Sequence, residues 1–199
     1  MFTIPDIHSA LEPCVCWSGA FSEEEIDAII ELGDAQEFHQ GKTGSGSDGK
    51  EDLTVRNSNI SWLLPAEDTA WLFNKMVEVV ARMNTDKYQF ELTSIDAFQY
   101  TTYTTGGLYS WHIDGMAEDT FGPRHRKLGI VLVLSDPATE FAGGEFQIIP
   151  DGNPNHVNTI EIKKGDVLAF PSFVPHQVAE VTSGKRRSLV CWVLGPKFK

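Results

Sequence analysis

Short runs of β-branched and aromatic residues, separated by turn residues, fill the chain from position 90 onward, and this pattern most limits its fold. The runs lie at 90–103, 127–134, 145–149, 158–162, 167–170, 176–181 and 188–193. Breaks such as Gly106-Gly107, Asp136-Pro137 and Gly143-Gly144 separate them. Many short strands with breaks of this kind predict a sandwich or barrel.

The first predicted helix begins at a capping box. Ser22 is its N-cap and Glu25 follows three residues later, a spacing at which each side chain can bond the other residue's backbone N–H. Phe21 and Ile26 occupy the hydrophobic-staple positions around this N-terminus. Gly33 is the predicted end of the helix, because glycine favours helix C-termini.

A second helix is predicted after Pro65. Its apolar residues recur at helical spacing and would form one buried face: Leu72, Met76, Val79, Val80 and Met83. Two helices ahead of a strand-rich region predict an α+β protein that is mainly β. We expect a double-stranded β-helix (jelly roll) core buttressed by N-terminal helices.

The stretch 41–52 between the two helices is rich in glycine and polar residues, which predicts a mobile loop that does not pack. A lid that orders over a substrate is the functional alternative. The chain has 199 residues and no linker, so we expect a single domain over 1–199. Within it, 1–89 would supply helical support and the loop, and 90–199 the jelly-roll core.

Charge and hydropathy argue against two classes of partner. The formal net charge of −12 would repel a phosphate backbone, so no nucleic-acid partner is expected. The apolar runs are shorter than the about 20 residues that span a bilayer, and the N-terminus lacks the pattern of a signal peptide. We therefore expect no membrane partner and a cytoplasmic location. Three cysteines, Cys14, Cys16 and Cys191, indicate reduced thiols and no disulfide framework.

The segment His112-Ile113-Asp114 supplies two groups that can bind a metal. Because strand side chains alternate, His112 and Asp114 would share one face of a strand or of its end. Alone, the pair also fits a surface histidine near a solvated aspartate, and His176 alone fits an ordinary half-buried histidine. Together, two imidazoles and one carboxylate can occupy one face of an octahedral metal and leave its other positions open. This ligand set suits a non-haem Fe(II) oxygenase.

Ten residues after His176 comes Arg186, in a pattern that predicts a strand, a tight Ser183-Gly184 turn and a second strand. This hairpin would place Arg186 antiparallel to the strand that carries His176, with its side chain inside the barrel. A buried guanidinium needs an anion, and a carboxylate matches its planar fork. Ser188 would face the same side. The alternative is a solvated basic hairpin tip, and the two roles can be shared, with Arg186 inward and Arg187 outward.

Four sequence blocks in the C-terminal hundred residues resemble the Fe(II)/2-oxoglutarate-dependent dioxygenases, in the prolyl 4-hydroxylase-like and PKHD-type hydroxylase branch. The blocks are 103–114, 143–146, 164–171, and His176 with Arg186 and Ser188. They occur in the order in which the family has them. The first ninety or so residues resemble the family only in being helical.

The resemblance implies a role for each matching residue. The Fe(II) ligands would be His112, Asp114 and His176. Arg186 would hold the distal carboxylate of 2-oxoglutarate, with Ser188 and Tyr103 as supporting contacts. Tyr100 and Tyr109 are close enough in sequence to compete with Tyr103 for this contact.

The implied reaction is hydroxylation of an unactivated C–H bond, with 2-oxoglutarate and O2 as co-substrates, release of succinate and CO2, and ascorbate as reductant. A prolyl residue in a peptide or protein is the implied substrate, and a free amino acid or another small molecule is the alternative. Two alternatives from other classes are a cupin-like metal protein without 2-oxoglutarate and a non-catalytic jelly-roll metal-binding module. Arg186 argues against the first, and the complete ligand set argues against the second. The oligomeric state is open.

Overall fold

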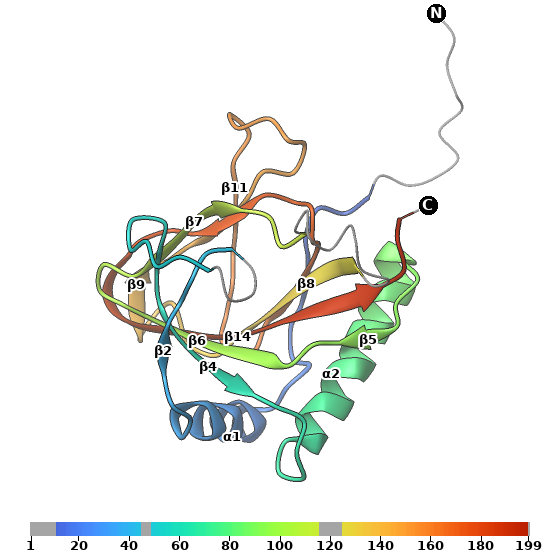
Figure 1. The fold of residues 1–199 in the computed structure, drawn as a ribbon, viewed down its shortest axis with the longest axis horizontal. Coiled ribbons are helices and arrows are strands. Elements are labelled where there is room, and N and C mark those ends of the chain that lie inside the picture. Colours follow the sequence, from blue (N-terminus) through green and yellow to red (C-terminus); the bar gives the residue numbers. More distant parts are fainter. Residues whose placement is uncertain (1–10, 45–48, 116–124, 199) are drawn as a thin grey trace, which may run out of the picture.

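The protein folds as two antiparallel sheets with two helices packed beside them, in a computed structural model that describes residues 11–44, 49–115 and 125–198. Helices α1 (Glu23–Asp34) and α2 (Ala70–Met83) lie together on one side of the larger sheet (Figure 1). A single turn of π-helix, η2 (Asn84–Tyr88), extends α2. The predicted class, mainly β with a jelly-roll core buttressed by helices, is confirmed.

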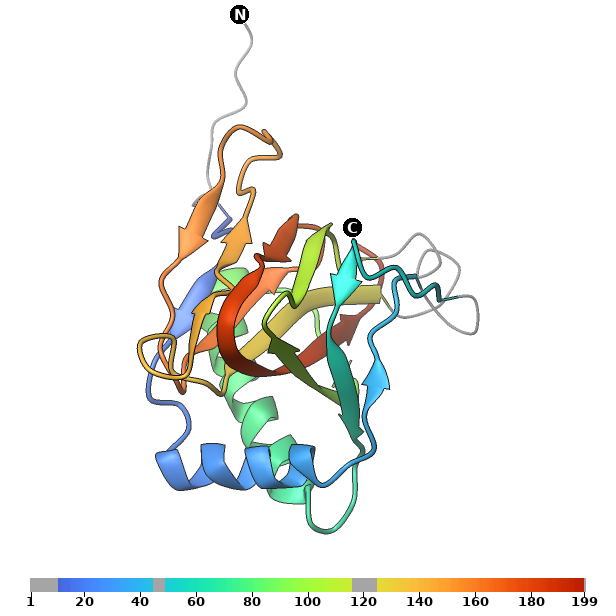
Figure 2. The ribbon, with the colours of Figure 1, turned by 90° about the vertical axis from the view of Figure 1, so that its left-hand side faces the viewer.

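The larger sheet has the strand order β1-β12-β8-β14-β6-β4-β2, and β5 and β9 also pair with β14. Its strands are β1 (Val15–Trp17), β2 (His39–Gln40), β4 (Asn59–Leu63), β5 (Ser94–Ile95), β6 (Phe98–Thr104), β8 (His125–Val133), β9 (Phe141–Gly143), β12 (Val167–Pro171) and β14 (Val181–Gly195). Strand β14 pairs with both β6 and β8, so it lies at the centre of the sheet. Figure 2 shows this long strand curving around the barrel.

The smaller sheet has the order β11-β10-β13-β7-β3. Its strands are β3 (Arg56–Asn57), β7 (Leu108–His112), β10 (Phe146–Ile148), β11 (Asn158–Ile160) and β13 (His176–Val178). Apolar side chains from both sheets form one buried cluster, which includes Tyr103 and Val131 of the larger sheet and Phe146 and Val178 of the smaller. The two sheets therefore pack face to face.

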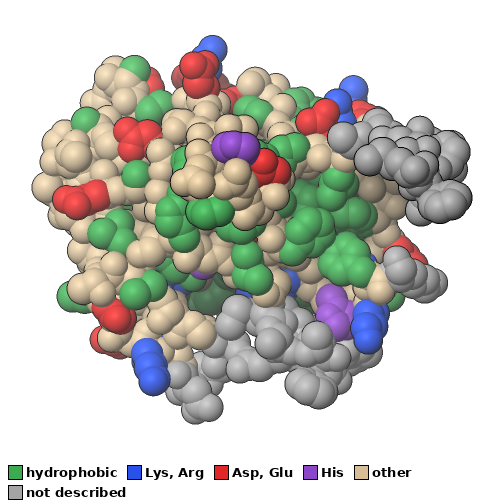
Figure 3. All heavy atoms as spheres, turned by 90° about the horizontal axis from the view of Figure 1, so that it is seen from above, with side chains coloured by type: hydrophobic (Ala, Val, Ile, Leu, Met, Phe, Trp, Pro, Cys, Tyr) green, Lys and Arg blue, Asp and Glu red, His purple; other side chains and the backbone are tan. Residues whose placement is uncertain are grey.

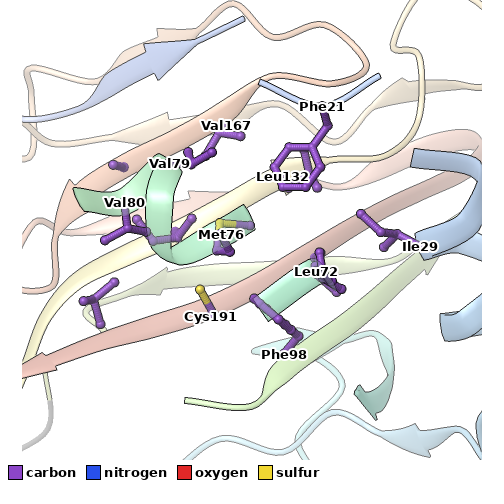
Figure 4. Close-up of a cluster of buried hydrophobic side chains, with 14 of the residues drawn as sticks. Phe21, Ile29, Leu72, Met76, Val79, Val80, Phe98, Leu132, Val167 and Cys191 are labelled. Atoms are coloured by element: carbon purple, nitrogen blue, oxygen red, sulfur yellow. The ribbon is translucent and has the colours of Figure 1, made fainter. Parts of the chain in front are cut away.

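Both predicted helix signals are confirmed. The Ser22 hydroxyl accepts from the Glu25 N–H at 3.3 Å, and the Ser22 N–H donates to the Glu25 carboxylate at 2.8 Å. Phe21 and Ile26 are buried, as a hydrophobic staple requires. All five apolar residues predicted on the second helix are buried on α2. Figure 4 shows residues of α2 packed between Phe21, α1 and the larger sheet.

Gly33 does not end α1. The helix continues through Asp34, and Ala35 is its C-cap. A Cβ at Gly33 would lie 2.4 Å from the ring of Tyr100, so this glycine lets the helix approach β6 closely. The glycine therefore marks a helix–sheet contact, which at sequence level has the same appearance as a stop signal.

Besides the predicted helices and loop, residues 1–89 supply strands that the sequence did not predict. Strand β4 pairs with β6 in the larger sheet, and β1 pairs with β12. Strand β3 pairs with β7 in the smaller sheet. Strands β1, β2 and β3 have only two or three residues, too few to show an alternating pattern, and their formation depends on the longer strands beside them. The N-terminal third thus contributes to both sheets.

Candidate active site

Three polar side chains of the smaller sheet converge between the two sheets. His112 ends β7, Asp114 follows two residues later, and His176 begins β13 directly opposite His112. Asp114 Oδ1 lies 3.9 Å from His112 Nε2 and 3.8 Å from His176 Nε2. One ligand atom from each residue lies within 4.8 Å of the other two. This spacing allows all three groups to bind a single ion.

Backbone carbonyls orient both imidazole rings. Nδ1 of His112 lies 2.8 Å from the carbonyl oxygen of Ser110, and Nδ1 of His176 lies 3.0 Å from that of Val174. Because a carbonyl can only accept, Nδ1 carries the proton and Nε2 presents a lone pair toward Asp114. Burial, together with the neighbouring His176, lowers the pKa of His112 to about 3. Its ring is therefore neutral near pH 7, the form that binds a metal.

Asp114 is fixed through its backbone and buried at its carboxylate. Its N–H donates to the Ser172 carbonyl at 2.9 Å, and its own carbonyl accepts from Arg126 Nη1 at 3.3 Å. Oδ2 is buried and has no hydrogen-bond partner among the described residues. Gly129 leaves the space for this oxygen, because a Cβ there would lie 2.5 Å from it. A buried carboxylate without a protein donor, beside two imidazole lone pairs, fits a divalent cation.

Arg186 lies on β14 in the same cavity as the three metal-binding groups. Its side chain is among the largest fully buried ones, at 1% exposed. Nη1 donates to the Ser188 hydroxyl at 3.3 Å, while Nε and Nη2 are buried without a partner among the described residues. Burial lowers the pKa of Arg186, but arginine titrates so far above neutrality that it stays charged. The group is therefore poised to bind an anion.

The predicted Ser183-Gly184 hairpin is wrong. Both residues lie inside β14, and the chain crosses from the smaller sheet to the larger one at 179–180. His176 and Arg186 thus line the cavity from different sheets. Gly184 has a φ of +80° like many turn glycines, but a Cβ there would lie 2.1 Å from the Glu140 carbonyl oxygen. It permits β9 to pass close to β14.

The outward orientation predicted for Arg187 agrees with the structure. Its Nη1 lies 3.4 Å from a carboxylate oxygen of Glu140, and its Nε lies 3.8 Å from one of Asp34. Alternation along β14 thus separates two adjacent arginines, one buried in the cavity and one paired on the opposite face.

The sequence profile of the 2OG-Fe(II) oxygenase superfamily matches residues 98–194. This match covers His112, Asp114, His176 and Arg186. The chain contains a 2OG-Fe(II) oxygenase domain. A PKHD-type hydroxylase of Parvibaculum lavamentivorans is 37% identical over 92 residues, which are 46% of this chain and 38% of that protein. Over this region the chain spans less than half the length of this and similar PKHD-type relatives.

Solved structures share the fold over almost the entire chain. A prolyl-4-hydroxylase of Pseudomonas putida has a TM-score of 0.72 at 20% identity, with 94% of each chain covered. A prolyl hydroxylase of Trichoplax adhaerens, in complex with a peptide of hypoxia inducible factor, has a TM-score of 0.74 at 18% identity, with 92% of this chain and 84% of that chain covered. The likeness extends to the N-terminal third, where the sequence showed only helices.

The cavity of the oxygenase domain has a volume of about 490 Å³. The three tyrosines that were candidates for the contact with 2-oxoglutarate differ in their position relative to it. Tyr103 and Tyr109 line it, whereas Tyr100 packs on the opposite face of the larger sheet and donates to Asp34 at 2.9 Å. The ring of Tyr103 lies 5.4 Å from the Arg186 guanidinium. The ring of Tyr109 stacks on His112 at 3.6 Å. Tyr100 is thereby excluded from the site.

Two cavity residues, Arg56 and Arg126, were missed from the sequence. Arg56 lies on β3, within residues 1–89, for which strands were not expected. Arg126 lies near the start of β8, one residue before a predicted strand. A basic residue directly before a buried strand was the sequence feature that could have indicated it.

The described ends of the 41–52 loop are partly ordered by pairing. Thr43 and Lys50 exchange two backbone hydrogen bonds of 2.9 Å, and Lys42 and Gly44 line the cavity. Positions 45–48 lie outside the described residues, so the predicted mobility and lid function stay predictions. No helix in the described parts of the chain is long and apolar enough to cross a bilayer.

Proposed function

We propose that this domain is an Fe(II)- and 2-oxoglutarate-dependent hydroxylase. One observation carries the proposal: a cluster of three metal-binding groups and a fully buried guanidinium with two unpaired nitrogens line one cavity. The proposed Fe(II) ligands are His112, Asp114 and His176. Arg186 would bind the distal carboxylate of 2-oxoglutarate, with Ser188 and Tyr103 as supporting contacts. When bound, Fe(II) and 2-oxoglutarate supply the O2-dependent chemistry that hydroxylates a C–H bond and yields succinate and CO2.

The chain's own residues would hold the reacting groups and limit access of water. The neutral imidazoles present lone pairs in fixed directions because their Nδ1 atoms are bonded to the backbone. Phe170 packs 4.5 Å from the His176 ring, and Phe146 packs against both. This apolar wall keeps the dielectric low around Arg186 and the metal site, which strengthens their interactions with charged ligands.

We propose a prolyl residue of a peptide or protein as the substrate. The likeness to a prolyl hydroxylase in complex with a peptide supports this choice. Hydrophobic side chains also gather on the face drawn in Figure 3, and exposed apolar areas are typical of interaction surfaces. Trp111, Ile113 and Phe173, all near the metal-binding residues in sequence, are 38%, 44% and 47% exposed. Ascorbate as reductant and a cytoplasmic location remain predictions from the sequence.

Anaerobic addition of Fe(II) and 2-oxoglutarate tests the proposal. The wild-type protein should develop the weak visible absorption of the iron–2-oxoglutarate complex, because the iron at the proposed site and the Arg186 guanidinium would each bind one carboxylate of 2-oxoglutarate. His176→Ala should abolish the band and the succinate formed in air, whereas His156→Ala, a variant of an exposed histidine on a loop, should retain both. Absence of the band in the wild type, or its persistence in His176→Ala, would refute the proposal. Mass spectrometry for one added oxygen on proline-containing peptides tests the substrate class.

A further inference from the structure

The cavity is also lined by two guanidinium groups that the proposed chemistry does not use. Arg56 is 6% exposed and lies directly opposite Tyr109 in the smaller sheet, with its guanidinium 4.5 Å from the centre of that ring. Arg126 is half-buried, and its guanidinium lies 3.9 Å from the centre of the Trp192 ring. Each cation is thus held against an aromatic face, a geometry that fixes guanidinium groups.

Neither guanidinium is neutralised by the described part of the chain. Arg56 Nε donates to the Ser58 hydroxyl at 3.0 Å and Nη1 donates to the Lys42 carbonyl at 3.1 Å, both uncharged acceptors. The bond from Arg126 goes to the backbone carbonyl of Asp114. No carboxylate of the described residues forms an ion pair with either arginine. Among the described residues, no hydrogen-bond acceptor is recorded for Arg56 Nη2 or for the Arg126 nitrogens other than Nη1.

This local excess of positive charge contrasts with the composition of the chain. The protein has 28 acidic and 16 basic residues, yet Asp114 is the only acidic residue among the described ones that line the cavity. That carboxylate is one of the three proposed metal ligands. An unpaired cation in a partly desolvated cavity is costly, and an anion in the cavity would offset this cost.

Both guanidiniums line the same cavity as Arg186, Tyr103 and Tyr109. The guanidinium of Arg56 lies 4.5 Å from the centre of the Tyr109 ring, and that of Arg186 lies 5.4 Å from the centre of the Tyr103 ring. Three guanidinium groups therefore share the cavity that holds the proposed metal site.

We propose that the substrate of this domain carries a carboxylate that Arg56 and Arg126 bind within the cavity. The inference rests on the proposed function, in which the two carboxylates of 2-oxoglutarate are already assigned to the metal and to Arg186. Arg56 and Arg126 are then left for the second substrate. A carboxylate matches a guanidinium fork in bidentate fashion and would anchor the substrate while its target C–H reaches the metal site.

Matched acid and amide probes test the inference and distinguish the two sources of such a carboxylate. One set consists of capped pentapeptides with a central proline and either Asp or Asn at each other position in turn. The second set consists of acetylated amino acids, proline included, and their amides. Binding is measured anaerobically as the change that each probe causes in the iron–2-oxoglutarate absorption band. A preference in the first set identifies an acidic side chain in a peptide, and one in the second set identifies an α-carboxylate such as that of a single amino acid.

At least one acid should bind on the order of tenfold tighter than its amide, because only the acid pairs with both guanidiniums. Arg56→Gln and Arg126→Gln should each reduce this ratio several-fold, Arg126→Lys should keep part of it, and the control Arg82→Gln on α2 should keep all of it. The inference is overturned if every acid binds no better than its amide, or if no acid binds while the absorption band is intact. Loss of the band itself refutes the proposed function instead.

Discussion

The two faces of the larger sheet are built from the same strands and serve opposite purposes. Along β14, Leu189, Cys191 and Val193 belong to the apolar core that also contains residues of both helices. The alternate residues of the same strand, among them Arg186 and Ser188, line the cavity. Among the described residues, the cavity side leaves Asp114 Oδ2 and two nitrogens of Arg186 buried without a hydrogen-bond partner.

This contrast teaches where the stability and the chemistry of the domain reside. On the helix side, each buried apolar side chain adds free energy by leaving water, about 25 cal/mol per Å² of apolar surface. On the cavity side, the unpaired carboxylate oxygen of Asp114 and the unpaired nitrogens of Arg186 cost free energy until ligands bind. Because strand residues alternate, substitutions at neighbouring positions of β14 should affect different properties: stability on the helix side and ligand binding on the cavity side.

The largest expected effect comes from the cavity face, in Arg186→Met. Removing one partner of a buried charge pair costs about 2–5 kcal/mol, so the affinity for 2-oxoglutarate should fall by roughly 30-fold or more. The unfolding free energy of the ligand-free protein should stay the same or rise, because a buried unpaired cation is replaced by an apolar chain of similar length. Calorimetric titration and urea unfolding measure the two quantities. Arg187→Met, on the opposite face, is the matched control and should keep the affinity.

Leu189→Ala is the reciprocal change on the helix side of the same strand. Leu189 is 1% exposed and pairs across the sheet with Leu132, which is also fully buried. Truncation of a buried leucine leaves a cavity, so the unfolding free energy should fall by about 2–5 kcal/mol. The affinity of the folded protein for 2-oxoglutarate should change little. A large loss of affinity without a loss of stability would contradict the separation of the two faces.

Sequence patterns predicted one face better than the other. The helix side follows from periodicity alone: the apolar stripe of α2 and the capping box of α1 were both identified correctly. The three proposed metal ligands were also predicted from the sequence, because His112 and Asp114 are two residues apart and His176 was available as a third ligand, and the structure brings them together. These features are local, or depend only on residue type, so the sequence contains them.

The cavity side required knowledge of strand register. Tyr100 and Tyr103 could not be separated without knowing that β6 turns Tyr100 toward the helices and Tyr103 toward the cavity. The sequence predicted a hairpin at Ser183-Gly184, because a glycine is typical of a tight turn. Gly184 instead lies within β14 and allows the close approach of the neighbouring strand. Arg56 was missed because β3 has two residues and exists only through its pairing with β7. Long-range pairing decides each of these cases.

The pH dependence of stability should expose the cavity side as the more acid-sensitive one. The pKa of His112 falls from an ordinary value of 6.5 to about 3 in the folded protein, chiefly through burial. Between these two pKa values, His112 is protonated in the unfolded chain but not in the folded protein, so the free energy of unfolding falls as pH is lowered from about 6.5 toward 3. The slope from this group is at most about 1.4 kcal/mol per pH unit. Urea unfolding of metal-free His112→Leu should lack this part of the slope, whereas His156→Leu should retain it.

The smallest expected effect lies at the contact between the metal site and the sheet, in Gly129→Ala. The new Cβ would lie 2.5 Å from both Asp114 Oδ2 and the Phe170 ring, so either the carboxylate or the ring must move. We expect metal affinity, measured by Co(II) titration, to fall about tenfold through displacement of the carboxylate. The double variant Gly129→Ala/Phe170→Leu separates the two contacts, because leucine frees space on the ring side only. If the carboxylate is the group displaced, the double variant regains stability but keeps the weak metal binding. Full recovery of metal affinity would instead assign the effect to Phe170 and show that the position of the Asp114 carboxylate does not depend on residue 129.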